Sequence, residues 1–168
     1  MTFKTFAICC CTLFLVACGS APVVRDTTLS REGWWSESTG EPSDKGNDIV
    51  IYALGLIDTS YKFGGKNPEA GLDCSGMVSY VYQHAADIKL TGSAAMMAKL
   101  GRVVSNKDLR PGDLVFFNTM HRPASHVGVY IGDGRFVDAP STNGKVRIDK
   151  LDNKYYAQRF EQARRYFD

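Results

Sequence analysis

The 168-residue chain is long enough for one domain with a substantial hydrophobic core, but short for two. Hydrophobic residues make up 44% of it and charged residues 23%, and the formal net charge of +2 gives no indication of a nucleic-acid partner. The sequence contains neither a G-x-x-x-x-G-K-[ST] phosphate loop nor an H-E-x-x-H zinc motif, so we expect no metal and no organic cofactor.

Residues 1–17 have the pattern of a signal peptide. One charge, on Lys4, precedes an apolar run that is short for a transmembrane helix. The run closes on "LVAC", which resembles the bacterial lipobox and implies that Cys18 becomes the lipidated amino terminus. The alternative is an ordinary signal peptide with incidental cysteines. Because no aspartate follows Cys18, the resemblance implies sorting to the inner leaflet of the outer membrane, facing the periplasm.

Residues 18–46 are predicted to be the lipidated cysteine followed by a flexible tether, because they are rich in Ser, Thr, Gly, Pro and charge. Trp34 and Trp35 interrupt this composition and either dock on the domain or lie at the membrane interface. The folded domain is predicted to span residues 47–168, and we expect a monomer.

The first half of this domain has helical periodicity. The stretch "NDIVIYALGLIDT" predicts a helix that begins at Asn47, and "YKFGGKNPEAG" after it predicts a loop. A second helix is predicted from Cys74, capped by Asp73, with an apolar stripe along one face. A third, shorter helix is predicted over 91–101, where Gly101 ends it.

The second half has the alternating pattern of strands. Strands are predicted at 113–117 and at 145–150, and "HVGVYIGDGRFVDAP" predicts a hairpin. The tail from residue 155 predicts a short helix followed by a terminal strand. Helices followed by strands indicate an α+β domain whose N-terminal helices pack on one antiparallel sheet.

The hairpin pattern places two polar residues together. Val129 and Val137 share one buried face only if the tip has an odd length, such as a three-residue Gly132-Asp133-Gly134 loop. In that register His126 and Asp138 share the opposite face on adjacent strands. Asp138 is then close enough to orient the imidazole ring of His126.

Cys74 is the only cysteine after the lipobox, in a chain expected to enter an oxidising compartment. Its position in the first turn of a helix favours the thiolate, because free backbone N–H groups and the helix dipole attract negative charge there. The alternative is a buried, inert cysteine. The exported setting favours the interpretation of Cys74 as a nucleophile over that of an inert cysteine.

A thiol nucleophile needs a base, and the chain has three histidines. His84 lies ten residues along the same helix, a rise of about 15 Å, so it cannot reach Cys74. His121 lies in a loop, whereas His126 opens a strand, where catalytic groups often sit. Taken alone, His126 would be interpreted as a structural histidine at the end of a strand, with its hydrogen bonds satisfied. Together with Cys74 and Asp138 it predicts a catalytic triad.

The motifs resemble the NlpC/P60 cysteine peptidases, a papain-like family of cell-wall hydrolases. The resemblance covers about residues 47–166 and is carried by four motifs: "YKFGG…GLDCSGMVSYVY", "LRPGDLVFF", "HVGVYIGDGRFVDAP" and "ARRY". It implies a papain-like fold and cleavage of peptidoglycan stem peptides, at γ-D-glutamyl–diaminopimelate bonds or D-alanyl–diaminopimelate cross-links. Alternatives are an amidase or acyltransferase of the same superfamily, and a non-catalytic envelope lipoprotein that binds stem peptides.

The resemblance also implies residue roles. Cys74 is the nucleophile, whose N–H helps to bind the oxyanion, and His126 is the general base and acid. Tyr61 lines the active site. Asp73 and Ser75 either contact the substrate amine or merely start the helix.

The sequence departs from the family pattern at Asp138, a position that is usually histidine. A carboxylate also accepts a hydrogen bond from an imidazole N–H, so Asp138 fits the role. His121 and Asn118, in the loop before His126, remain alternatives for it.

Overall fold

The described part of the chain, residues 43–142 and 144–168 of a computed structural model, begins with helix α1 (Asp44–Leu54). The side chain of Ser43 accepts a hydrogen bond from the backbone N–H of Gly46 at 3.0 Å, which satisfies one of the free N–H groups at the helix start. The helix therefore begins before the predicted start at Asn47, and the end of the predicted tether belongs to it.

The predicted amino-terminal features lie outside the described residues. They are the signal peptide at 1–17, the lipidation site Cys18, and the tether residues Trp34 and Trp35. None of the helices in the described ranges combines the length and the apolar character needed to cross a membrane.

Helix α2 (Cys74–Ala86) confirms the predicted second helix. Asp73 caps it as expected, since its carboxylate accepts a hydrogen bond from the N–H of Gly76 at 2.7 Å. The predicted apolar stripe faces the core, where its residues Val78, Val81 and Tyr82 are fully buried.

Helix α3 (Ala94–Met97) is shorter than the helix predicted over 91–101. The chain turns at Gly101, which has a positive φ of 69°, into strand β3 (Arg102–Val104) and the 3₁₀ turn η1 (Asn106–Asp108). The sequence did not predict β3, because three residues are too few for a strand alternation to be visible.

Among the described residues, six strands form an antiparallel sheet in the order β3–β8–β4–β5–β6–β7. A separate two-stranded ribbon precedes α2. This arrangement confirms the predicted α+β class and the antiparallel sheet. The remaining elements are β1 (Lys66–Asn67), β2 (Gly71–Leu72), β4 (Leu114–Phe117), β5 (His126–Gly132), β6 (Arg135–Asp138), β7 (Arg147–Lys150), α4 (Lys154–Ala157) and β8 (Phe160–Arg165).

The β5–β6 hairpin has the predicted register but a different tip. Val129 pairs with Val137, and Gly128 pairs with Asp138. The tip is a two-residue turn, Asp133-Gly134, in which both residues have positive φ, and a bulge in β5 after Tyr130 supplies the extra residue. The predicted three-residue loop is therefore wrong, but the bulge restores the odd count that the pairing needs.

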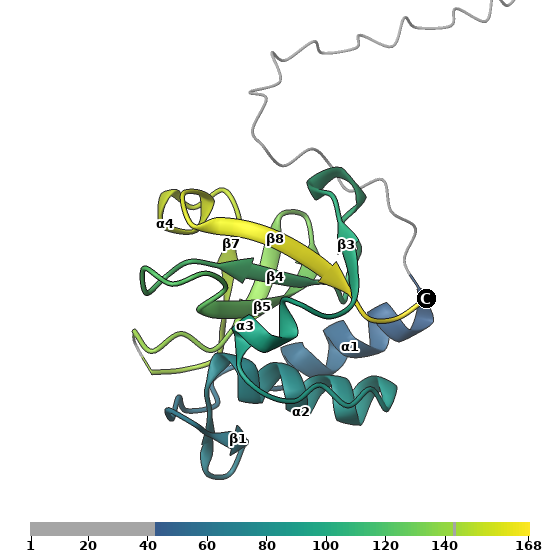
Figure 1. Ribbon diagram of the computed structural model, residues 1–168. Helices are drawn as coiled ribbons and strands as arrows, with labels where there is room; N and C mark the ends of the chain where they lie inside the picture. The colour runs from purple at the N-terminus through teal and green to yellow at the C-terminus, as the bar shows by residue number, and fades with distance from the viewer. Residues whose placement is uncertain (1–42, 143) are drawn as a thin grey trace, which may run out of the picture. The chain divides into compact units, whose positions relative to one another are not determined.

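Both faces of the sheet are buried at its central strands β4, β5 and β6. Helices α1, α2 and α3 cover one face, against which Leu114, Val127 and Val129 pack (Figure 1). The opposite face carries a second core that the sequence did not predict. This core includes Phe117, Tyr130, Phe136, Leu151 and Tyr156.

A buried ion pair joins the segment before β4 to the end of β8. The guanidinium of Arg165 donates from Nε and Nη2 to the two carboxylate oxygens of Asp113, each at 2.6 Å. Arg165 also donates to the backbone oxygen of Asp108 at 2.8 Å, and the N–H of Arg110 donates to Asp113 at 2.8 Å. Asp113 of the "LRPGDLVFF" motif and Arg165 of the "ARRY" motif are thus joined by a bidentate ion pair.

Candidate active site

The thiol of Cys74 lies at the first residue of α2, directly after the cap. Oδ1 of Asp73 accepts hydrogen bonds from the N–H of Gly76 at 2.7 Å and from the hydroxyl of Ser75 at 2.9 Å. Oδ2 of Asp73 accepts from the N–H of Gly64 at 2.9 Å. Asp73 therefore fixes the helix start and also ties the preceding loop to it.

Two close backbone contacts explain Gly65 of the "FGG" motif and Gly76 of the "DCSG" motif. A Cβ atom on Gly76 would lie 1.9 Å from the carbonyl oxygen of Gly65, and one on Gly65 would lie 2.2 Å from that of Gly71. Only glycine permits this approach. The N–H of Asp73 also donates to Gly65 O at 3.1 Å, so the loop and the helix start form one rigid unit around Cys74.

Tyr61 lies at the start of this loop, beside the thiol. Its backbone bridges to Leu72, and its side chain is partly buried against the same core on which Cys74 packs. Burial raises the pKa of Tyr61, and the nearby negative charges of Cys74 and Asp73 raise it further. The predicted residues Tyr61, Asp73 and Ser75 are therefore grouped around Cys74.

His126 and Asp138 form the predicted contact. Nε2 of His126 lies 2.7 Å from Oδ2 of Asp138, and Asp138 is fully buried. Neither His121 nor Asn118 holds this position: His121 is exposed in the loop, and the buried Oδ1 of Asn118 has no hydrogen-bond partner among the described residues. His84 lies elsewhere, with Nδ1 at 2.7 Å from Tyr80 O.

The geometry makes His126 a stable cation beside the thiol. Because Asp138 occupies Nε2, Nδ1 is the ring nitrogen available to Cys74. Burial lowers the pKa of His126, but the hydrogen bonds to Asp138 and Cys74, together with the charges of both groups, raise it overall from 6.5 to about 10. A buried histidine with a thiol on one side and a carboxylate on the other is the arrangement that thiol catalysis requires.

A polar chain that the sequence analysis missed extends from Asp138. The hydroxyl of Tyr156, on α4, lies 2.9 Å from Oδ2 of Asp138 and 3.1 Å from Oδ2 of Asp149. Asp149 in turn accepts a hydrogen bond from Nε of Arg147 at 2.8 Å. Tyr156 thus supports the carboxylate that holds the imidazole of His126.

Local periodicity did not reveal this chain for a physical reason. On β7 the polar side chains of Arg147 and Asp149 point inward, whereas Ile148 between them is 41% exposed. An alternating pattern is normally interpreted with the apolar residue inside. The available signal was the Arg-x-Asp spacing, which places two opposite charges on one face of a strand.

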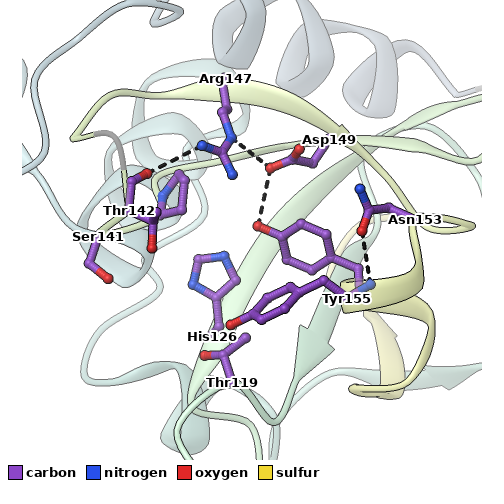
Figure 2. A pocket seen from close by; sticks show the side chains of 10 residues that line it. Thr119, His126, Ser141, Thr142, Arg147, Asp149, Asn153 and Tyr155 are labelled. Atoms are coloured by element: carbon purple, nitrogen blue, oxygen red, sulfur yellow. Dashed lines mark hydrogen bonds and ion pairs between the residues drawn. The ribbon is translucent and has the colours of Figure 1, made fainter.

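A pocket of about 220 Å³ lies beside His126 (Figure 2). Polar groups from β7, α4 and the loop after β6 surround it. Within the described ranges, no group of three or more His, Cys, Asp or Glu side chains is placed to hold a metal ion. The pocket is lined by Thr119, His126, Pro140, Ser141, Thr142, Arg147, Asp149, Asn153, Tyr155 and Tyr156.

Comparison with known proteins gives a consistent result. A family model described as "NlpC/P60 family" matches residues 58–165. The chain is 43% identical over 122 residues to "Probable endopeptidase YafL" of Escherichia coli, which covers 70% of this chain and 49% of YafL. It is 32% identical over 172 aligned positions to "Probable endopeptidase" of Haemophilus influenzae, which covers 97% of this chain and 98% of that protein.

A solved structure with a similar fold is the NlpC/P60 domain of the peptidoglycan hydrolase SagA. It has a TM-score of 0.62 and 28% identity, and the match covers 72% of this chain and 98% of that domain. The chain spans only 36% to 56% of the length of several curated relatives, which include the "Murein DD-endopeptidase MepH" of Escherichia coli.

Proposed function

Since the chain belongs to the NlpC/P60 family, we propose that it is a cysteine peptidase that cleaves amide bonds in the peptides of peptidoglycan. The observation that carries the proposal is the position of Cys74 at a helix start, near enough to His126 to raise the pKa of its imidazole, while Asp138 holds the ring from the other side. The names of the relatives agree with it, since several are endopeptidases.

The proposed reaction proceeds in two steps. The Cys74 thiolate attacks the carbonyl carbon of the scissile amide, and the oxygen becomes an oxyanion beside the N–H of Cys74. The C–N bond then breaks as the His126 imidazolium gives its proton to the leaving amine, which leaves a thioester on Cys74. Water attacks the thioester while neutral His126 takes a proton from it, and the acid product and the thiolate–imidazolium pair are formed.

Tyr61, Asp73 and Ser75 are proposed to bind substrate near the nucleophile. Their grouping around Cys74 supports this role. The carboxylate of Asp73 already accepts three hydrogen bonds from the helix start and the loop, so it would contact a substrate amine in addition to capping the helix. The hydroxyl of Ser75 donates to Asp73, which leaves its lone pairs free to accept.

Two bonds are proposed as the target, and product analysis separates them. Cleavage of γ-D-glutamyl–diaminopimelate bonds yields fragments with a new amino-terminal diaminopimelate. Cleavage of D-alanyl–diaminopimelate cross-links converts dimeric muropeptides into monomers. Mass spectrometry of purified muropeptides after digestion tests the proposal: either product set supports it, and intact muropeptides with properly folded protein would refute it.

We also propose that lipid on Cys18 holds the enzyme on the inner leaflet of the outer membrane, facing the periplasm, where it acts as a monomer on nearby peptidoglycan. The support is the "LVAC" pattern and the match to peptidoglycan enzymes of the cell envelope. Replacement Cys18→Ser should abolish incorporation of labelled palmitate and release the protein from the membrane fraction. Unchanged labelling would contradict lipidation at this residue.

A further inference from the structure

The pocket beside His126 has one cationic group with unused hydrogen-bonding capacity. Nε of Arg147 donates to Asp149 at 2.8 Å, and Nη1 donates to the backbone oxygen of Thr142 at 3.2 Å. Nη2 has no hydrogen-bond partner among the described residues. Figure 2 shows this third nitrogen on the side of the guanidinium that faces the imidazole of His126.

The guanidinium is held in a fixed orientation. Asp149, which binds Nε, is itself held by the hydroxyl of Tyr156 at 3.1 Å, and its side chain is only 18% exposed. A guanidinium fixed along one edge keeps its other N–H groups preorganised for a planar anion. The other charged side chains lining the pocket are Asp149, which Arg147 already pairs, and His126, which Asp138 pairs. Arg147 is therefore suited to bind a carboxylate.

The position of the pocket indicates which part of a substrate enters it. In the proposed reaction His126 protonates the leaving amine, so the leaving residue must lie against the imidazole. The pocket is lined by His126, by Thr119 in the loop before it and otherwise by residues that follow it in the chain, whereas Tyr61, Asp73 and Ser75 surround Cys74 on α2 and the preceding loop. The pocket therefore belongs to the leaving-group side of the scissile bond.

We propose that this pocket binds a free carboxylate of the residue on the leaving-group side, with Arg147 as its specificity-determining residue. The inference rests on the proposed peptidase function. Diaminopimelate has two carboxyl groups, and one of them lies outside the stem-peptide backbone. In both proposed target bonds diaminopimelate is the leaving residue and carries that free carboxylate. A lysine in the same position offers no such group, and an amidated diaminopimelate offers a neutral one.

The test compares two muropeptides that differ only in whether this carboxylate is free or amidated. The wild-type protein should cleave the free acid with a kcat/KM about 10- to 100-fold higher, the range that one charged hydrogen bond supports. In Arg147→Gln this preference should fall to about twofold or less, with the loss mainly in KM. Equal cleavage of both substrates by the wild type, or an undiminished preference in Arg147→Gln, would overturn the proposal.

Arg135→Gln is the matched control. Arg135 also lies on a strand and also pairs with an aspartate two residues away, Asp133 at 2.9 Å, but it is at the hairpin tip and does not line the pocket. It should retain the full preference for the free acid. A loss of preference equal to that of Arg147→Gln would indicate a general effect of surface charge and would also overturn the proposal.

A second assay needs no variant, in case Arg147→Gln does not fold. Leaving-group peptides with a free or an amidated carboxylate are compared as inhibitors of wild-type cleavage. The inhibition constant of the free acid should be lower than that of the amide by about tenfold or more. Equal constants would overturn the inference. Failure of the proposed function is a separate result, since the folded wild type would then cleave neither muropeptide.

Discussion

Nε2 of His126 lies 2.7 Å from Oδ2 of Asp138, and this contact is buried between β5 and β6. Both donors to Asp138, the imidazole of His126 and the hydroxyl of Tyr156, reach Oδ2, while the buried Oδ1 has no partner among the described residues. The carboxylate thus stabilises the imidazolium and directs Nδ1 of the ring toward Cys74. In the proposed mechanism this relationship activates the thiol.

Replacement Asp138→Asn should shift the alkaline limit of activity to lower pH. The pKa of His126 is raised to about 10, so the imidazolium persists as the pH rises toward that value. Without the Asp138 charge the pKa of His126 falls, and the imidazolium is lost earlier, by about one pH unit or more. The pH profile of kcat/KM between pH 6 and 10.5 measures this shift. An unchanged alkaline limb would mean that Asp138 does not set the charge of His126.

Replacement Tyr156→Phe should weaken the support of Asp138 while keeping the aromatic packing. The single O–H of Tyr156 serves two carboxylates, those of Asp138 and Asp149, and its ring packs edge-on against Phe136. Loss of this donor in a buried site should cost about 1–3 kcal/mol of unfolding free energy. It should also reduce kcat, because Asp138 is then held less firmly.

Urea unfolding and steady-state kinetics measure both effects of Tyr156→Phe. The neighbouring Tyr155→Phe is the control for stability, since Tyr155 is 46% exposed and no hydrogen bond from its hydroxyl is present among the described residues. It should change stability by about 0.5 kcal/mol or less. Equal losses of unfolding free energy in the two variants would show that the Tyr156 hydroxyl has no special role.

Replacement Arg165→Met should destabilise the domain by about 3–5 kcal/mol, because it leaves the buried Asp113 carboxylate without its counter-ion. Urea unfolding measures the change. Arg164→Met is the control, since Arg164 is only partly buried and hydrogen-bonds to Gln162. The double variant Asp113→Leu with Arg165→Met should recover part of the loss, and a double variant less stable than Arg165→Met would contradict the explanation.

Replacement Gly76→Ala should distort the site that contains Cys74. A Cβ at this position would lie 1.9 Å from the backbone oxygen of Gly65, and a backbone atom cannot move aside without displacing the loop from the helix start. We expect a loss of stability of about 2 kcal/mol or more and a large loss of activity. Gly55→Ala is the control, because its nearest contact is 3.4 Å, and it should be tolerated.

The predictable part of the site came from short stretches with strong periodicity. The stripe of α2 and its Asp73 cap placed Cys74 at a helix start, and the alternation of β5 and β6 placed Asp138 beside His126. The tip of that hairpin was predicted wrongly, because a bulge and a longer loop satisfy the same apolar pattern.

The parts that could not be predicted depend on tertiary structure. Tyr156 reaches Asp138 only because α4 folds back over the face of the sheet opposite α1 and α2. Arg147 and Asp149 point inward because a polar pocket is built there. Ile148 therefore faces outward, although it is hydrophobic. Propensity and alternation contain no information about such packing.

The most direct measurement of the central claim is the digestion of purified peptidoglycan by the wild-type protein and by Cys74→Ser. We expect the wild type to release new free amino groups, and Cys74→Ser to reduce the rate by about a thousandfold or more. The thermal unfolding midpoint of Cys74→Ser should stay close to that of the wild type, because the substitution is nearly isosteric. Equal release of amino groups by the two folded proteins would contradict the assignment of Cys74 as the nucleophile.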